Sequence, residues 1–463
     1  MAGVPTVSPD GGKPAQAKRF GGQGRAYLPH MPPTSAPGPG PAAHGTRLPR
    51  LAPPGSYDDA DAAAPGARRV PDQAARAERG ADLTPRPHLT ELRLSAYAGH
   101  RATVLRLGPV TLLTGPSGSG KSTALAACAA LAALGNGATL AEAFPEPHAA
   151  VPESARPDPQ RRRGFRIGCV SDGPAGPVRL DLAVQAEPEL RVVGERLSGG
   201  DGVVHLETAL RDPARRSVQA AWHTAGTTTV TRAPFPDDLL GTTLLPLRVA
   251  GRTKEQRRVL AAAEQTVLAL RTLYPCAPDP AAMRPPAAAG DGLLRGDCAN
   301  LAEVLHRAER ECRTRYGFLE AAVREGCAGA VDGLATSLLP DGGIVARLLR
   351  PDGPGTPLAH LGAGELRHLA LALVLLTGPG VLDLDPASEV PGALQTLTVL
   401  ADDFDLHLDA RQSTLLLDLA ARMAVRGHIR LLGALSRPPL PTEAPAGVRL
   451  VELGAEVRGT PER

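Results

Sequence analysis

The chain has 463 residues, enough for two or three compact units. Hydrophobic residues make up 43% and charged residues 21%, so a buried core can form, and an aromatic share of 3% means that Leu, Ala and Val must build it. The 51 Lys+Arg against 48 Asp+Glu give a net charge of +3. This balance excludes a strongly basic nucleic-acid-binding protein, although it allows a local basic groove.

Six cysteines stand without a CxxC or other paired spacing, so the sequence supports neither a metal site nor a disulfide framework. A reducing environment is therefore expected. No apolar run approaches the roughly 20 residues that cross a bilayer, and the start does not resemble a secretory signal. We expect a cytoplasmic protein that is not bound to a membrane.

Residues 1–88 differ in composition from the rest of the chain. They contain 16 Pro and 12 Gly, a share above the roughly 25–30% at which an aperiodic segment usually stays unfolded. We interpret them as a disordered, mildly basic tail, with a tether for an acidic surface or an over-extended gene start as alternatives. The remaining chain divides into the first half of a folded domain at 89–250, a helical insertion at 251–345 and the second half of the domain at 346–463.

The predicted elements follow in chain order. Residues 89–94, 103–107 and 110–113 alternate or concentrate apolar side chains as strands do, and residues 122–134 form an Ala/Leu-rich helix that stops at Gly135. Short β-type runs from residue 165 to about 222 predict an antiparallel lobe. Helical periodicity follows over 254–273 and 300–323, and an α/β pattern returns from 357 to about 453.

A phosphate-binding loop is the strongest motif of the chain, because its letters match GxxxxGK[ST] in full. Its members are Gly115, Pro116, Ser117, Gly118, Ser119, Gly120, Lys121 and Ser122. Glycines let backbone N–H groups surround a polyphosphate, and the following helix directs its positive end at the same phosphates. Lys121, one of only four lysines, is placed to reach the β- and γ-phosphates, and Ser122 to bind Mg²⁺.

A P-loop also needs a carboxylate at the end of a neighbouring strand. The β-type run 397–401 ends in Asp402 and Asp403, of which we assign the first to the metal and the second to the attacking water. A competing pair, Asp383 and Asp385, follows a shorter run among Gly and Pro and is disfavoured.

From these motifs the sequence resembles the ABC-type P-loop ATPases, in particular the heads of the RecF, SMC and OLD-like group. The resemblance rests on the segment 402–409, similar to a Walker B and D-loop, and on the segment 361–365, similar to an LSxGE signature opening a helix. It covers roughly residues 89–135 and 296–436. Residues 197–201 copy the signature letters better, but a β-type run follows them and predicts a hairpin turn.

The resemblance implies an α/β fold of the ABC/RecF type, with ATP and Mg²⁺ as ligands. Two copies would meet head-to-tail, with each ATP between the P-loop of one and the signature loop of the other. Lys121 and Asp403 would be catalytic, and Ser122 and Asp402 would hold the metal. The further nucleotide contacts that it implies are Thr123, Leu361, Gly362, Ala363, Gly364, Glu365 and Asp409.

Three positions depart from the family pattern, and all three bear on hydrolysis. Gly362 replaces a serine, Asp403 replaces a glutamate, and Leu435 stands at the place of a switch histidine. A convincing Q-loop glutamine is also absent. Because a lost polar contact to transferring charge costs on the order of 10²–10³ in rate, we expect tight Mg-ATP binding with slow hydrolysis.

Three functions remain open. The first is an ATP-driven clamp or switch in DNA maintenance or defence, acting as a homodimer on DNA or with a separate effector protein. The second is a nucleotide-dependent regulator with little turnover. The third is a transporter ATPase subunit, disfavoured by the missing Q-loop and by the 240 residues between Lys121 and Leu361. The basic run 161–163 is interpreted as a solvated loop, with a phosphate contact as its alternative.

Overall fold

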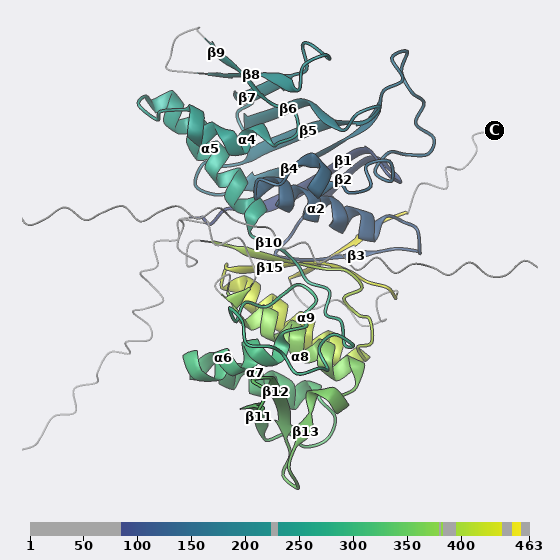
Figure 1. Cartoon of the computed structure of the whole chain (residues 1–463), viewed down its shortest axis with the longest axis vertical. Helices are drawn as coiled ribbons and strands as arrows, with labels where there is room; N and C mark the ends of the chain where they lie inside the picture. The colour runs from purple at the N-terminus through teal and green to yellow at the C-terminus, as the bar shows by residue number, and fades with distance from the viewer. Residues whose placement is uncertain (1–84, 224–229, 379–380, 383–394, 438–446, 455–463) are drawn as a thin grey trace, which may run out of the picture. The chain divides into compact units, whose positions relative to one another are not determined.

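The computed structural model describes residues 85–223, 230–378, 381–382, 395–437 and 447–454. Residues 1–84 of the tail predicted over 1–88 lie outside these ranges, and so do the competing acids Asp383 and Asp385. The described part contains an eight-stranded, a five-stranded and a three-stranded sheet, together with helices that pack on them (Figure 1).

The eight-stranded sheet is antiparallel throughout. It includes the antiparallel lobe predicted for residues 165 to about 222, together with strands on either side of that segment. Its order is β2-β1-β4-β5-β6-β7-β8-β9. The strands are β1 (His88–Tyr97), β2 (His100–Arg106), β4 (Arg163–Asp172), β5 (Val178–Glu187), β6 (Arg191–Gly199), β7 (Val204–Ala209), β8 (Ser217–His223) and β9 (Val230–Pro236). Alternating apolar residues on one face enter a core that also includes helix residues.

The five-stranded sheet is parallel and has the order β10-β14-β15-β3-β16. Its strands are β3 (Val110–Thr114), β10 (Leu273–Pro275), β14 (Leu397–Ala401), β15 (Ile429–Ala434) and β16 (Val448–Glu452). Successive residues enter different cores, since Leu113 packs in one and Leu112 in the other. Such a sheet is covered on both faces, which explains the continuous apolar runs of β3 and β14.

The five-stranded sheet separates the two cores, and helices cover both of its faces. The helices α2 (Lys121–Gly135) and α5 (Lys254–Arg271) share the core of the eight-stranded sheet, whereas α8 (Ala363–Leu376) and α9 (Ala410–Val425) lie in the other core. Figure 1 shows the two pairs on opposite sides of the five-stranded sheet. Two short helices, α3 (Leu140–Ala143) and α4 (Gly241–Arg248), also contribute to the core of the eight-stranded sheet.

The segment 251–345 is not purely helical, so this expectation is corrected. It supplies β10 to the five-stranded sheet and the hairpin of β11 (Gly333–Leu338) and β12 (Ile344–Leu349). With β13 (Thr356–Pro357), the hairpin forms the three-stranded sheet, before the 3₁₀ turn η1 (Leu358–His360). Strands this short carry little periodicity, which is why they were not predicted.

The helix predicted over 300–323 is also corrected, because it consists of two helices. These are α6 (Leu301–Glu311) and α7 (Arg313–Gly326), which meet at Cys312. The backbone of Cys312 has φ −148° and ψ 83°, outside the helical region. The apolar residues keep a period near 3.6 on both sides of Cys312, so the sequence pattern does not reveal the break in the backbone.

The predicted hairpin at 197–201 is confirmed. Strands β6 and β7 pair antiparallel, and the N–H of Gly199 donates to the carbonyl of Val203 at 2.9 Å. Residues 197–201 thus belong to a hairpin of the antiparallel sheet and open no helix.

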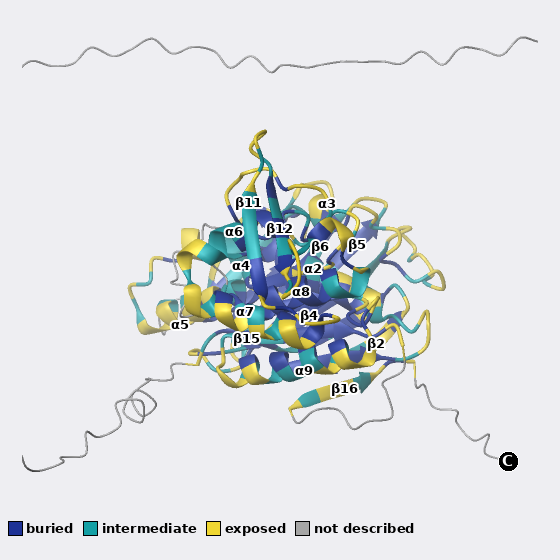
Figure 2. Ribbon diagram, turned by 90° about the horizontal axis from the view of Figure 1, so that it is seen from below, coloured by how far each residue is buried: buried dark blue, intermediate teal, exposed yellow. Residues whose placement is uncertain are grey.

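In Figure 2 the buried residues concentrate between the sheets, whereas α9 and the edge strand β16 present exposed residues.

Candidate nucleotide-binding site

The loop between β3 and α2 has the geometry that its glycines predict. Gly115 and Gly120 adopt φ of 134° and 94°, values that favour glycine. At Gly115 a Cβ would lie 2.2 Å from the carbonyl oxygen of Leu453, which follows β16, so another side chain has no room there. The tip of the loop, residues 116–118, is exposed. Its backbone is therefore open to a ligand at the start of α2.

Two functional side chains of the loop occupy defined positions. The Lys121 ammonium donates to the carbonyls of Gly115 at 2.8 Å and Pro116 at 3.1 Å, so it lies over the loop. The Ser122 hydroxyl donates to Oδ1 of Asp402 at 3.1 Å, across 280 residues of sequence. A hydroxyl and a carboxylate oxygen are ligands that Mg²⁺ accepts. The fold therefore brings together the two residues that were predicted to hold the metal.

The sheet order explains this meeting. Strand β15 lies between β3 and β14, and all three run parallel. The carboxyl ends of β3 and β14 are consequently at the same edge, which places the P-loop and the acids of residues 402–403 near each other.

His100 is a functional residue that sequence reasoning did not identify. It begins β2, is 4% exposed, and its Nε2 lies 3.0 Å from the carbonyl oxygen of Gly120. Its Nδ1 lies 3.1 Å from the Thr103 hydroxyl. Because the carbonyl of Gly120 only accepts, Nε2 carries the proton in this contact. Its signal in the sequence was its place between the β-type runs 89–94 and 103–107, ahead of the P-loop strand.

The loop after β14 is fixed by backbone and side-chain contacts. Asp403 is exposed and has φ 45°, and its N–H donates to Oδ1 of Asp402 at 3.1 Å. Asp405, which the sequence did not single out, accepts from the N–H of Ser436 at 2.7 Å and of Arg437 at 3.0 Å. This carboxylate ties the loop to the end of β15.

The predicted signature loop precedes α8. Leu361 is buried, and Gly362 and Ala363 open the helix. The Glu365 carboxylate accepts from the N–H of Gly362 at 3.2 Å and of Ala328 at 3.1 Å, so it caps the helix. Packing requires a glycine at position 364, because a Cβ there would lie 2.5 Å from the carbonyl oxygen of His407.

The signature loop and the P-loop are not brought together within one chain. The helices that they open, α8 and α2, belong to different cores on opposite faces of the five-stranded sheet. Among the residues that the structure describes, no hydrogen bond joins residues 361–365 to residues 115–123.

Other predicted residues take structural positions. The Asp409 carboxylate accepts from the N–H of Gln412 at 2.7 Å and caps α9. Leu435 is 8% exposed, with its N–H bonded to the carbonyl of Leu113 at 2.9 Å, so an apolar side chain fills the switch position. In the basic run 161–163, Arg162 and Arg163 form ion pairs with Asp158 and Glu187.

Asn300 precedes α6 but does not cap it through its side chain. Its Oδ1 instead accepts from the N–H of Arg295 at 3.1 Å, and its amide nitrogen donates to the carbonyl of Leu293 at 2.7 Å. The buried amide therefore fixes the turn before the helix.

In the residues that the structure describes, no three His, Cys, Asp or Glu side chains gather as a metal site built from these side chains would require. Likewise, within the described ranges no helix combines the length and apolar character that a membrane span requires.

Comparisons with known proteins give matches to solved structures only. No protein-family model matches the chain, and neither does any curated protein sequence. The similar structures include an SMC head bound to the C-winged helix domain of ScpA, at 14% identity and a TM-score of 0.38, covering 76% of this chain and 90% of that chain.

Two others are an SMC head domain from Thermotoga maritima and an Smc head domain with an extended coiled coil bound to the C-terminal domain of ScpA, derived from Pyrococcus furiosus. Their identities are 13% and 10% and their TM-scores 0.35 and 0.38; each covers 76% of this chain, and 89% and 90% of their own lengths are matched. At these TM-scores the likeness is loose, and the assignment of the site rests on its own geometry.

Proposed function

We propose that this protein binds Mg-ATP at residues 115–123, hydrolyses it slowly, and forms a head-to-tail homodimer around two ATP molecules. The observation that carries the proposal is the contact of Ser122 with Asp402 beside the Lys121 ammonium. When bound, Mg²⁺ would neutralise charge on the β- and γ-phosphates. The exposed loop amides and Lys121 would hold the phosphates, and Ser122 and Asp402 the metal.

The placement of α2 and α8 supports the dimer. Because these helices pack in different cores on opposite faces of the sheet, a second copy could supply the N-terminus of α8 to a phosphate held at α2. In a pair of copies, the N-terminus of α8 in one copy would face the γ-phosphate in the other. ATP would then contribute to the interface, and its hydrolysis would release the two heads.

The test is the molar mass in solution, measured by light scattering with and without Mg-ATP. We expect Mg-ATP to convert wild-type monomers to dimers, and EDTA to prevent this. Lys121→Ala should weaken ATP binding about 10- to 100-fold, since a hydrogen bond to a charged group contributes about 1.5–3 kcal/mol.

Lys254→Ala is the matched control, because Lys254 is exposed at the start of α5 and lies outside the P-loop. It should bind ATP and dimerise like the wild type. A wild-type protein that stays monomeric at saturating Mg-ATP would overturn the dimer, and calorimetry without a binding signal would overturn the nucleotide site.

A clamp or switch in DNA maintenance or defence is the use of this site that we favour. A nucleotide-dependent regulator is the second candidate, favoured by Gly362, Asp403 and Leu435. The outer face of the eight-stranded sheet carries a cross-strand row of charged residues, which bears on whether the protein is a DNA clamp or a regulator. In register these are Arg93, Asp181, Arg196, Glu207 and Arg232.

The signs in this row alternate, so the face is not uniformly basic. Arg93 lies 3.7 Å from Asp181, and Arg196 lies 3.9 Å from Glu207. Paired arginines release fewer counterions from DNA than free ones, so a clamp should bind duplex DNA with a shallow salt dependence. Duplex binding that requires Mg-ATP and weakens with salt would support the clamp, and ATP-dependent dimers without DNA affinity would support the regulator.

A further inference from the structure

Arg367 is a buried cation two residues after the signature loop. It lies on α8, is 4% exposed, and in the described part of the chain forms no ion pair with a carboxylate. Its Nη1 donates to the carbonyl of Pro278 at 2.7 Å, and its Nη2 donates to the carbonyl of Asp403 at 2.9 Å. Burial lowers the pKa of Arg367 from its ordinary value, although Asp403 and Asp405 act in the opposite direction. Keeping a guanidinium at such a place is costly.

The two acceptors belong to loops that leave neighbouring strands. Pro278 follows the end of β10, and Asp403 follows the end of β14. These strands pair in parallel, so their carboxyl ends lie side by side. The planar guanidinium can span the two carbonyls because its donors form a rigid fork, which a lysine lacks.

The carbonyl of Asp403 also accepts from the N–H of Leu406 at 2.9 Å. A non-glycine residue at φ 45° needs such support from its surroundings. Helix α8 contacts the same loop a second time, since Gly364 packs against the carbonyl of His407. The first turns of α8 thus contact both ends of the segment 403–407.

We propose that Arg367 is a positioning residue that couples the signature loop to Asp403. The inference rests on the proposed function. In the head-to-tail dimer, the signature loop of one copy serves one ATP, and Asp403 of that copy serves the other. A shift of α8 as its signature loop binds ATP would move the Asp403 carbonyl through Arg367, so the two sites would act together. Two packed elements joined by a rigid side chain can carry such coupling.

The test measures hydrogen exchange of the full chain with and without Mg-ATP, together with the single-turnover rate. Arg367→Met removes both donors and keeps most of the volume, and Arg367→Lys keeps the charge without the fork. Arg422→Met, on the exposed side of α9, is the matched control. In the wild type we expect Mg-ATP to slow exchange in both 115–123 and 402–409.

In Arg367→Met the protection of 115–123 should remain, with the affinity for Mg-ATP within about twofold, whereas the protection of 402–409 should be lost. The single-turnover rate should fall about 10- to 100-fold, because a displacement of about 1 Å at a reacting group can have this effect. Arg367→Lys should lie between Arg367→Met and the wild type, and Arg422→Met should match the wild type.

Equal protection of 402–409 in Arg367→Met and wild type would overturn the coupling. Loss of the fold in both Arg367 variants would also overturn it, because the residue would then be structural. If the wild type bound no Mg-ATP, the proposed function would fail, and exchange at 402–409 in the nucleotide-free variants would still decide whether Arg367 holds this loop.

Discussion

Single residues hold the P-loop from two sides. His100 contacts the carbonyl of Gly120 near the end of the loop, and the carbonyl of Leu453 closes the space beside Gly115 at its start. Neither residue belongs to the motif, yet both restrict its backbone. A loop that must present several amides at once gains affinity when its conformation is fixed before the ligand arrives.

His100→Ala should therefore weaken Mg-ATP binding. The Gly120 carbonyl keeps the N–H of Ala124 as a donor at 2.9 Å, so the substitution removes one hydrogen bond, worth about 0.5–1.5 kcal/mol, and we expect a roughly 2- to 10-fold loss of affinity in calorimetry. His148→Ala removes an exposed histidine that contacts Glu187 in the antiparallel lobe, and it serves as the control. An affinity equal to that of the wild type in His100→Ala would show that the contact does not support the loop.

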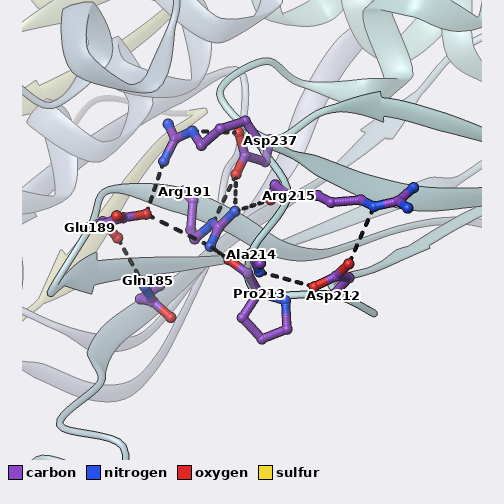
Figure 3. A network of polar contacts seen from close by, with 9 residues as sticks. Gln185, Glu189, Arg191, Asp212, Pro213, Ala214, Arg215 and Asp237 are labelled. Carbon is purple, nitrogen blue, oxygen red and sulfur yellow. Dashed lines mark hydrogen bonds and ion pairs between the residues drawn. The ribbon is translucent and has the colours of Figure 1, made fainter.

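At the scale of elements, a buried ion pair joins the far strands of the eight-stranded sheet (Figure 3). Arg191, at the start of β6, donates through Nε to Asp237 at 2.8 Å, just beyond β9. Its Nη1 donates to the carbonyl of Pro213 at 2.8 Å, and its Nη2 contacts the carbonyl of Arg215. Both charged side chains are almost fully buried, so each depends on the other.

Arg191→Met should destabilise the protein by about 3–5 kcal/mol, since it leaves Asp237 buried without its main partner. Urea unfolding of the full chain measures the change in the free energy of unfolding. Arg216→Met is the comparison, because Arg216 is 58% exposed and lies 3.5 Å from the same carboxylate, and it should cost at most about 1 kcal/mol. The double variant Arg191→Met/Asp237→Leu should recover much of the loss, and equal effects of the two single arginine variants would contradict this account.

At the scale of the whole molecule, packed strands and helices hold the P-loop and the acids of residues 402–403 in place. Three positions that hydrolysis would use, however, lack the side chains expected there. Gly362 offers no hydroxyl, the Asp403 side chain is one methylene shorter than a glutamate, and the switch position holds the buried Leu435. In the proposed function, a triphosphate would bind without any of the three. Turnover, which needs groups aimed at the developing charge, is what these departures weaken.

We therefore expect slow hydrolysis of bound ATP, in a single-turnover assay with labelled nucleotide. Asp403→Glu should raise the rate, because the longer side chain brings the carboxylate nearer the attacking water, and Asp403→Asn should lower it about 10²-fold. Both variants should bind Mg-ATP like the wild type. Rapid turnover by the unmodified protein alone would contradict the prediction.

Some of this architecture could be predicted because it depends on local sequence. The P-loop requires glycines at fixed places between a buried strand and a helix, and the structure has this strand, loop and helix at 110–135. The acids at 402–403 follow a buried strand as predicted. The antiparallel lobe and the hairpin at 197–201 likewise follow from alternation and turn chemistry.

Long-range packing decided the rest. The order of the parallel strands brings Ser122 to Asp402, and no local pattern encodes this order. His100 and Arg367 act through backbone carbonyls, whose positions depend on the assembled sheets. The break at Cys312 is invisible in the sequence because both of its helices keep a similar period. Sequence alone thus determined the P-loop motif and the candidate residues for a triphosphate, whereas the tertiary structure decided which of them meet, because contacts between distant segments depend on how whole elements pack.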